Sequence, residues 1–226
     1  MVNEAVVYAI DNDQAMLESL SWIIDSIGFK VKMYTRAQNF LDEYNSKMPG
    51  CILLDVRMPG MSGAELQMKL NDLENQGLAI PPIIFISGHA DVSLAVQTMK
   101  AGAFDFLTKP FNTHQLLETI NKAIRLDQEN RAKVQHSVEA HVRFASLSAR
   151  ETEVLQGILA GKVNKVISAE LKISSKTVEV HRASLMKKMA VKSVSELVKL
   201  VLSNNVQETL QGMIFLFNKC SLTQQD

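Results

Sequence analysis

The chain has 226 residues, of which 46% are hydrophobic, enough for one large or two modest globular domains. Its formal net charge is zero, but residues 1–145 hold 13 Lys and Arg against 17 Asp and Glu, whereas residues 146–202 hold 10 against 5. These opposite charges predict two domains, and the second is the candidate for binding a polyanion.

Cysteine usage and hydropathy exclude several classes of protein. Cys51 and Cys220 are too few for a disulfide framework or a metal cluster, and they indicate a reducing compartment. The first ten residues lack a basic region and a long apolar stretch, and no window of eighteen residues is apolar and uncharged. We therefore expect a soluble, cytosolic protein with no membrane partner.

The first part of the chain alternates short apolar runs with helical patterns. Five strands are expected, at residues 5–10, 29–34, 51–55, 82–87 and 103–109. Between them, one helix is expected up to Ile27, with Gly28 at its C-terminal cap, and another over residues 91–101 with Asp91 as its N-cap. This alternation predicts a parallel sheet with helices on both faces.

Polar residues follow the predicted strands. In open parallel sheets, ligands bind at the carboxyl ends of the strands, where the strand order reverses. If the order is 2-1-3-4-5, Asp11 and Asp55 meet in one crevice, and Ser87 and Lys109 end the last two strands. Clustered carboxylates repel one another without a cation, and oxygen ligands favour Mg²⁺. An Asp beside Mg²⁺, with Ser and Lys to hold phosphate oxygens, can accept a phosphoryl group.

This constellation resembles the receiver domain of response regulators over residues 4–126. The matching segments are Asp11-Asn12, Asp55 with the following VRMPGMSG, Ser87 in PIIFISGHAD, and Lys109-Pro110. The resemblance implies a five-stranded, doubly wound, flavodoxin-like domain over residues 1–126.

The resemblance also implies roles for individual residues. Asp55 is then the phosphorylated aspartate, Ser87 and Lys109 contact the phosphoryl group, and Phe106 takes the aromatic switch position. Lys109-Pro110 is expected to form a cis peptide bond. The implied Mg²⁺ ligands are Asp11, Asn12, Asp55 and the backbone carbonyl of Arg57.

Asn12 departs from the family pattern, which usually has two adjacent acids after the first strand. Asn keeps an oxygen ligand but loses a charge, so weaker Mg²⁺ binding is expected, with Asp13 as an outer-sphere substitute. An alternative follows, in which the receiver is no longer phosphorylated and serves only for dimerisation of a DNA-binding protein.

Enzymatic alternatives explain less of the sequence. The segment AIDND also resembles the haloacid-dehalogenase phosphatases, with Asp11 as nucleophile and Asp13 as general acid. Those enzymes need a further acidic cluster after the lysine, but no carboxylate follows Lys109 until Glu118, and Asp55 is left without a role. No second set of catalytic residues suggests a small-molecule substrate. We expect a phosphoacceptor regulator with at most weak self-dephosphorylation.

Residues 127–145 are expected to form a helical linker. No Pro or Gly occurs between Pro110 and Gly157, and Val134, Val138 and Val142 lie four residues apart. This apolar stripe is compatible with pairing to a second linker or with lying on a domain surface.

Residues 146–204 are expected to form a domain of four short helices. A capping box at Ser148 to Glu151 opens the first helix, and Gly161 ends it. The second covers residues 164–171, the third lies within 173–189, and SVSE (193–196) opens the fourth.

The third of these helices has two distinct faces. Val178, Leu185 and Met189 share one side, with His181 close by. The opposite side carries Lys176, Val180, Ala183 and Lys187. One face can thus hold the helix in its domain while the other enters a major groove.

The segments LSARETEVL and AGKVNKVISAELKISSKTVEVHRASLMKKMAVKS closely resemble the LuxR-type helix-turn-helix of NarL- and FixJ-like regulators. The resemblance implies that the third helix recognises DNA, that the fourth supports dimerisation, and that His181 is a core histidine. The expected DNA contacts are Lys176, Thr177, Glu179, Val180, Ala183, Lys187 and Lys188.

Together, these features predict a two-component transcription regulator. A sensor histidine kinase is expected to phosphorylate Asp55, which promotes homodimerisation and binding to double-stranded promoter DNA, with RNA polymerase as a further candidate partner. Residues 205–226 form a tail of open role, since the apolar run MIFLF (213–217) suits either packing on the helix-turn-helix domain or a dimer contact.

Overall fold

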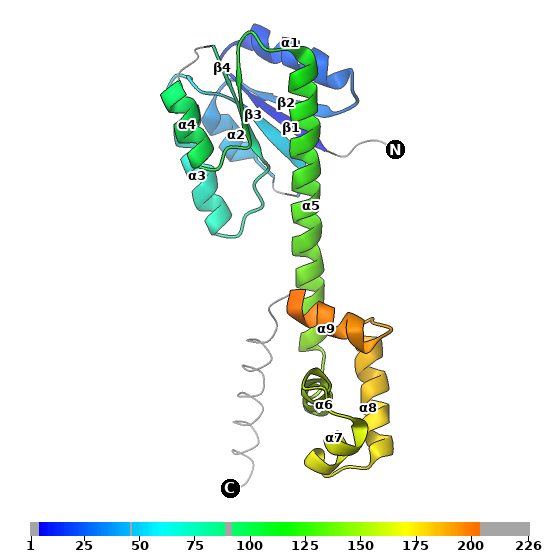
Figure 1. The fold of residues 1–226 in the computed structure, drawn as a ribbon. Helices are drawn as coiled ribbons and strands as arrows, with labels where there is room; N and C mark the ends of the chain where they lie inside the picture. The colour runs from blue at the N-terminus through cyan, green and yellow to red at the C-terminus, as the bar shows by residue number, and fades with distance from the viewer. Residues whose placement is uncertain (1–4, 46, 89–91, 204–226) are drawn as a thin grey trace. The chain divides into compact units, whose positions relative to one another are not determined.

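The computed structural model describes residues 5–45, 47–88 and 92–203. The chain divides into two compact units, Met1–Ala132 and Lys133–Asp226. Helix α5 (Thr113–Ala145) continues from the first unit into the second (Figure 1). The linker expected at 127–145 is thus the second half of this helix. Two predictions, the Asp91 cap and the role of the tail, lie outside the described residues.

The first unit is built on a parallel sheet in the order β2-β1-β3-β4-β5, as predicted. Its strands are β1 (Val6–Ile10), β2 (Lys30–Tyr34), β3 (Gly50–Asp55), β4 (Ile83–Ser87) and β5 (Asp105–Thr108). Strands β1, β3 and β4 are buried along their whole length, which explains their continuous apolar sequences. Ile10 of β1 is in register with Leu54 of β3, so Asp11 and Asp55 follow at the same level.

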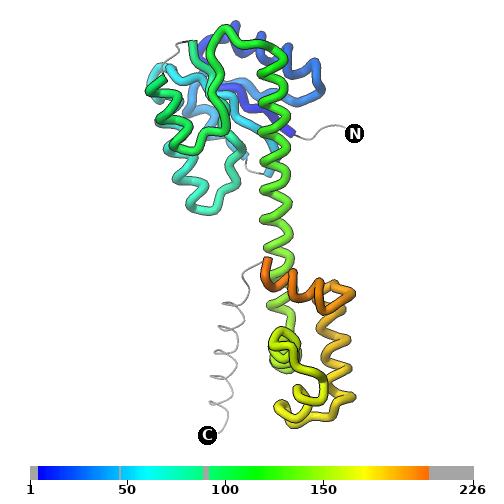
Figure 2. Tube along the Cα trace, viewed as in Figure 1, coloured from blue at the N-terminus to red at the C-terminus, as the bar shows by residue number. Residues whose placement is uncertain are grey.

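Helices cover both faces of the sheet, which confirms the predicted fold class. They are α1 (Gln14–Asp25), α2 (Ala37–Glu43), α3 (Gly63–Asn75), α4 (Val92–Lys100) and the first part of α5. One core joins α1 and α5 to the sheet, and a second core joins α2 and α3 to the opposite face, with Leu94 of α4 packed against it. In Figure 2 the sheet lies between α5 on one side and α3 and α4 on the other.

Helix α1 ends earlier than predicted. Its last residue is Asp25, and the following amides of Ile27 and Gly28 bond to carbonyls only three residues back. The chain then turns at Gly28, whose φ of +82° suits a glycine. On the outer side of α1, Trp22, which is the single tryptophan of the chain, is 79% exposed.

At the amino end of the central strand β3, a buried acid ties α5 to the sheet. Asp127 is 3% exposed, and its Oδ2 accepts hydrogen bonds from the Gly50 amide at 2.8 Å and from Arg131 Nε at 2.7 Å. These two contacts hold α5 against the sheet as far as its last turn within the first unit.

The second unit contains the four predicted helices. They are α6 (Ala149–Leu159), α7 (Asn164–Leu171), α8 (Ser175–Lys188) and α9 (Val194–Ser203). Their core also takes in Ala140 and Phe144 from the end of α5. The capping box at Ser148 is present, but the one predicted at Ser193 is only half formed, because Glu196 accepts from the Lys192 amide instead.

The valine stripe of α5 faces away from this core. Val134, Val138 and Val142 are 63%, 54% and 66% exposed, so no part of the described chain covers them. Among the residues that the structure describes, no helix is both long enough and apolar enough to cross a bilayer.

Candidate functional site

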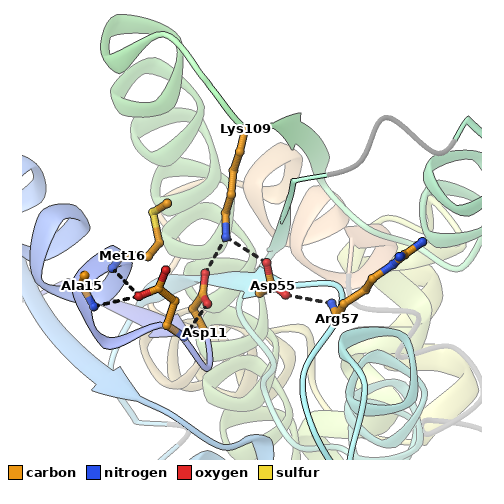
Figure 3. A network of polar contacts seen from close by, with 7 residues as sticks. Asp11, Ala15, Met16, Asp55, Arg57 and Lys109 are labelled. Atoms are coloured by element: carbon orange, nitrogen blue, oxygen red, sulfur yellow. Dashed lines mark hydrogen bonds and ion pairs between the residues drawn. The ribbon is translucent and has the colours of Figure 1, made fainter.

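The receiver pocket gathers side chains from the carboxyl ends of four strands. Asp11 follows β1, Asp55 is the last residue of β3, Ser87 ends β4, and Lys109 follows β5. Figure 3 shows Lys109 reaching between the two aspartates. The four residues expected from the sequence to converge therefore do so, and all line one cavity of about 240 Å³.

Lys109 joins the two carboxylates. Its Nζ lies 2.7 Å from Asp11 Oδ2 and 3.0 Å from Asp55 Oδ1. Burial disfavours the ammonium form, but the hydrogen bonds and charges of the two aspartates outweigh it and raise the pKa of Lys109. Both carboxylates are nearly buried, so the lysine supplies the positive charge that keeps two acids together in this pocket.

The remaining carboxylate oxygens are held by backbone amides. The amide of Asp13 donates to Asp11 Oδ1 at 2.9 Å, and the amide of Arg57 donates to Asp55 Oδ2 at 2.8 Å. These contacts fix the orientation of both side chains, as Figure 3 shows for Asp55 and Arg57.

The loop after Asp55 packs closely against the strand that carries it. The amide of Gly63 donates to the carbonyl of Val56, and Ser62 opens α3 with a complete capping box. A Cβ at Gly63 would lie 2.3 Å from the carbonyl oxygen of Asp55, so a larger residue cannot be accommodated without moving the strand end. Gly63, the second glycine of MPGMSG, is thus explained by the close approach of its backbone to the Asp55 carbonyl oxygen beside the site.

The oxygen donors in the pocket fit the chemistry of Mg²⁺. Asp11, Asn12, Asp55 and Arg57 all line the cavity. Within the described chain no group of three His, Cys, Asp or Glu residues has metal-binding geometry, but Mg²⁺ in proteins commonly takes only one or two carboxylates and keeps several waters. Two carboxylates, an amide oxygen and a backbone carbonyl meet that requirement.

Asp13 caps helix α1, in addition to the outer-sphere role expected from the sequence. Its Oδ1 accepts hydrogen bonds from the amides of Ala15 at 3.0 Å and Met16 at 3.3 Å, which makes it the N-cap of α1. Oδ1 is therefore engaged at the helix terminus, and Asp13 also lines the same cavity.

Two further receiver predictions can be located. Phe106 is half-buried on β5, and its ring stacks on Phe85 with centroids 6.3 Å apart. The Lys109-Pro110 peptide bond is cis, as expected.

In the second unit, α8 presents the two faces that its sequence predicts. Val178, Leu185 and Met189 are fully buried. The opposite face is exposed, and it carries Lys176, Glu179, Val180, Ala183 and Lys187. A three-residue turn separates α7 from α8, and Lys172 adopts a left-handed conformation in it, with φ of 54°. This geometry is that of a helix-turn-helix whose second helix is free to enter a groove.

Two of the predicted DNA contacts make bonds within the domain. The hydroxyl of Thr177 bonds to Ser174 Oγ at 2.7 Å as part of the N-cap of α8. Lys188 Nζ donates to Glu151 Oε2 at 2.6 Å and to the Ser146 carbonyl at 3.0 Å. His181, expected as a core histidine, is only partly buried.

Glu151 was predicted only as the partner of the Ser148 cap, but it also joins α6 to α8. Glu151 is 4% exposed, and its carboxylate accepts from Ser184 Oγ at 2.6 Å, from Lys188 and from the Ser148 amide. Burial opposes ionisation, but the hydrogen bonds from Lys188, Ser184 and Ser148 prevail and lower its pKa to about 2. This acid therefore stays charged and holds the base of the exposed helix.

Comparison with known proteins identifies both domains. Residues 7–121 match the model of the response regulator receiver domain, and residues 145–201 match that of the bacterial regulatory proteins of the luxR family.

Relatives with both domains span most of the chain. The response regulator protein TmoT of Ectopseudomonas mendocina is 46% identical over 196 residues, which cover 87% of each chain. The transcriptional regulatory protein FixJ of Bradyrhizobium diazoefficiens is 42% identical over 89% of this chain and 97% of its own. The solved structure of the response regulator StyR has a TM-score of 0.79 and 40% identity, and the match covers 88% of this chain and 98% of StyR.

These matches confirm the resemblances drawn from the motifs. A receiver domain implies a sensor kinase as its partner, and a LuxR-type domain implies DNA. Receiver domains generally use Mg²⁺, and the family consists of regulators rather than typical enzymes. The chain belongs to the two-component response regulators that join a receiver to a LuxR-type DNA-binding domain.

Proposed function

We propose that Asp55 accepts a phosphoryl group from a sensor histidine kinase and thereby controls binding of α8 to promoter DNA. The observation that carries this proposal is the position of Lys109, which bonds to both Asp11 and Asp55 at the switch point of the sheet. This arrangement gathers a nucleophile, a cation to hold phosphate oxygens and a metal-binding acid in one cavity.

The residues of the cavity divide the work of phosphoryl transfer. An oxygen of Asp55 forms the new bond to phosphorus as the bond from phosphorus to the donor's imidazole nitrogen breaks. Lys109 stays close enough to bond to the transferred group, and Ser87, 3% exposed at the end of β4, lines the same cavity. Mg²⁺, held by Asp11, Asn12, Asp55 and the Arg57 carbonyl, would neutralise charge on the phosphoryl oxygens.

Asn12 lowers the negative charge of this cavity. With Lys109 already paired to both carboxylates and Asp13 engaged at the helix cap, the ligand set has one charge fewer than a site with two adjacent acids. We expect weaker Mg²⁺ binding for this reason.

DNA binding is assigned to the exposed face of α8. Lys176, Glu179, Val180, Ala183 and Lys187 are the contacts supported by exposure. The engaged hydroxyl of Thr177 and ammonium of Lys188 are assigned to holding α8 in place. Since lysine–phosphate contacts release counterions, the affinity should fall steeply as salt is added.

The two sites must communicate through a two-state element. The stacked pair of Phe106 and Phe85 lies on adjacent strands that lead into the pocket, which makes Phe106 the proposed switch residue. A coupling of about 1 to 3 kcal/mol would change DNA affinity or dimerisation roughly five- to hundredfold.

Homodimerisation would place two copies of α8 on two half-sites. A regulator of promoters acts in the cytoplasm, where it can also meet RNA polymerase, and any activity of its own is limited to weak self-dephosphorylation.

Asn12 also supports a second candidate, a DNA-binding regulator that works without phosphorylation. In that protein, the Lys109 pairs with Asp11 and Asp55 would be purely structural, and the receiver would serve for dimerisation.

A direct test incubates the full chain with acetyl phosphate and Mg²⁺ and measures its mass and its oligomeric state. We expect a labile adduct of one phosphoryl group and a shift toward dimer. Both should disappear in Asp55→Asn and persist in Asp13→Asn, which alters a second acid of the same cavity. If neither acetyl phosphate nor beryllofluoride changes the protein, the phosphorylation-independent candidate replaces the first.

A further inference from the structure

The exposed face of α8 is not uniformly polar. Lys176, Val180, Ala183 and Lys187 follow one another at spacings of four, three and four residues, so they form one stripe along the helix. All four are exposed, and Val180 is 62% exposed. The stripe therefore has a lysine at each end and two apolar residues at its centre.

A single exposed valine needs no explanation by itself. The position of Val180 is informative because the opposite face of the same helix, with Val178 and Leu185, is completely buried. The orientation of α8 is thus fixed. The centre of its exposed stripe, at Val180, is the part that would approach closest to the floor of a groove. Ala183, one turn further on, has a side chain too short to keep the groove floor away from Val180.

The major groove offers few partners for such a surface. Guanine, adenine and cytosine present hydrogen-bonding groups there, and only thymine presents an apolar group, its C5-methyl. Valine and alanine side chains cannot bond to base edges, so placing them against guanine or cytosine would remove water from polar atoms without replacing their bonds. Against thymine, the same side chains bury a methyl group, while Lys176 and Lys187 remain free to meet phosphates or guanines at the ends of the stripe.

We propose that Val180, assisted by Ala183, selects thymine at the centre of each half-site by contact with its C5-methyl group. This inference rests on the proposed binding of DNA by α8, and it adds the class of base that the helix reads. Burial of one methyl-sized group corresponds to about a fourfold change in affinity.

The test removes the methyl group and nothing else. The full chain, with and without acetyl phosphate, is used to select binding sites from a pool of randomised duplexes. The selected duplex is then synthesised with each thymine replaced in turn by deoxyuridine, and dissociation constants are measured by fluorescence anisotropy at constant salt. We expect the unaltered protein to bind about fourfold more weakly when one or two central thymines are replaced.

Two variants connect this loss to the side chain. Val180→Ala should bind the thymine duplex about fourfold more weakly and should no longer distinguish thymine from deoxyuridine. This exposed substitution leaves the core of the unit unchanged. Val142→Ala alters a valine of similar exposure, 66%, on α5 of the same unit, and should retain the full preference for thymine.

The possible failures are distinct. If no sequence is enriched from the pool, the proposed DNA-binding function fails, and the inference fails with it. If sequences are enriched but deoxyuridine binds as well as thymine at every position, or if Val180→Ala keeps the preference, DNA binding stands and the assignment of Val180 is overturned.

Discussion

The charge of Glu151 should stabilise the second unit, and Glu151→Gln tests this. Glutamine keeps the shape, and its single carbonyl oxygen can still accept from the Ser148 amide while its NH2 group faces Ser184 Oγ, but it leaves Lys188 without a counter-charge. A pKa of about 2 in place of the ordinary 4.5 corresponds to about 3 kcal/mol of stability at neutral pH. Because the Lys188 side chain is 37% exposed and therefore partly screened, we expect a loss of about 2 kcal/mol.

The direction of the Glu151 pKa shift determines how this stabilisation depends on pH. The folded state lowers the pKa of Glu151, so the stabilisation is complete above pH 4.5 and disappears as the pH falls toward 2. The difference between the unaltered protein and Glu151→Gln should therefore be constant between pH 7 and 5 and should shrink below pH 4.5.

Hydrogen exchange resolved by peptide is the appropriate assay, because it reports on α6 and α8 separately from the receiver. A loss of about 2 kcal/mol should speed exchange of their slowest amides roughly thirtyfold. Glu153→Gln is the control, since Glu153 pairs with Arg150 on the exposed side of the same helix, where such pairs contribute at most about 1 kcal/mol. Equal effects of the two substitutions would refute the reasoning.

Three further substitutions test the receiver. Asn12→Asp should raise the Mg²⁺ affinity at least about fivefold through its added charge, and titration calorimetry that gave equal affinities would contradict the role assigned to Asn12. Gly63→Ala should cost about 2 kcal/mol in urea denaturation, because its Cβ would meet the Asp55 carbonyl at 2.3 Å; unchanged stability would show that the strand end yields easily. Asp127→Asn should lower the stability of the first unit by about 2 to 3 kcal/mol, because it leaves Arg131 without its buried counter-charge. Unchanged hydrogen-exchange rates in β3 would exclude this stabilising role of Asp127.

The fold could be predicted from sequence because its signals are local and repeated. Continuous apolar runs identified β1, β3 and β4, and the spacing of apolar residues in α8 separated its buried and exposed faces. Lys109 and the two aspartates could be brought together because the rule for the ends of parallel strands converts sequence positions into spatial neighbours.

Sequence reasoning missed several contacts that individual side chains make. Asp13 lies next to the predicted metal-binding motif, but it also caps α1, which requires only amides two and three residues away. The link from Glu151 to Lys188 spans 37 residues, and no spacing rule connects them. Helical angle placed His181 near the core, but it could not show that this ring is only partly covered.

The exposed position of Trp22 has a spectroscopic consequence. As the single tryptophan, 79% exposed on α1, it already emits from an aqueous environment in the native protein. Unfolding should therefore change its emission wavelength little, which makes intrinsic fluorescence a poor measure of stability for this chain. The same property makes it a sensitive reporter of contact, since any molecule that covers the outer side of α1 will exclude water from the indole and shift its emission to the blue.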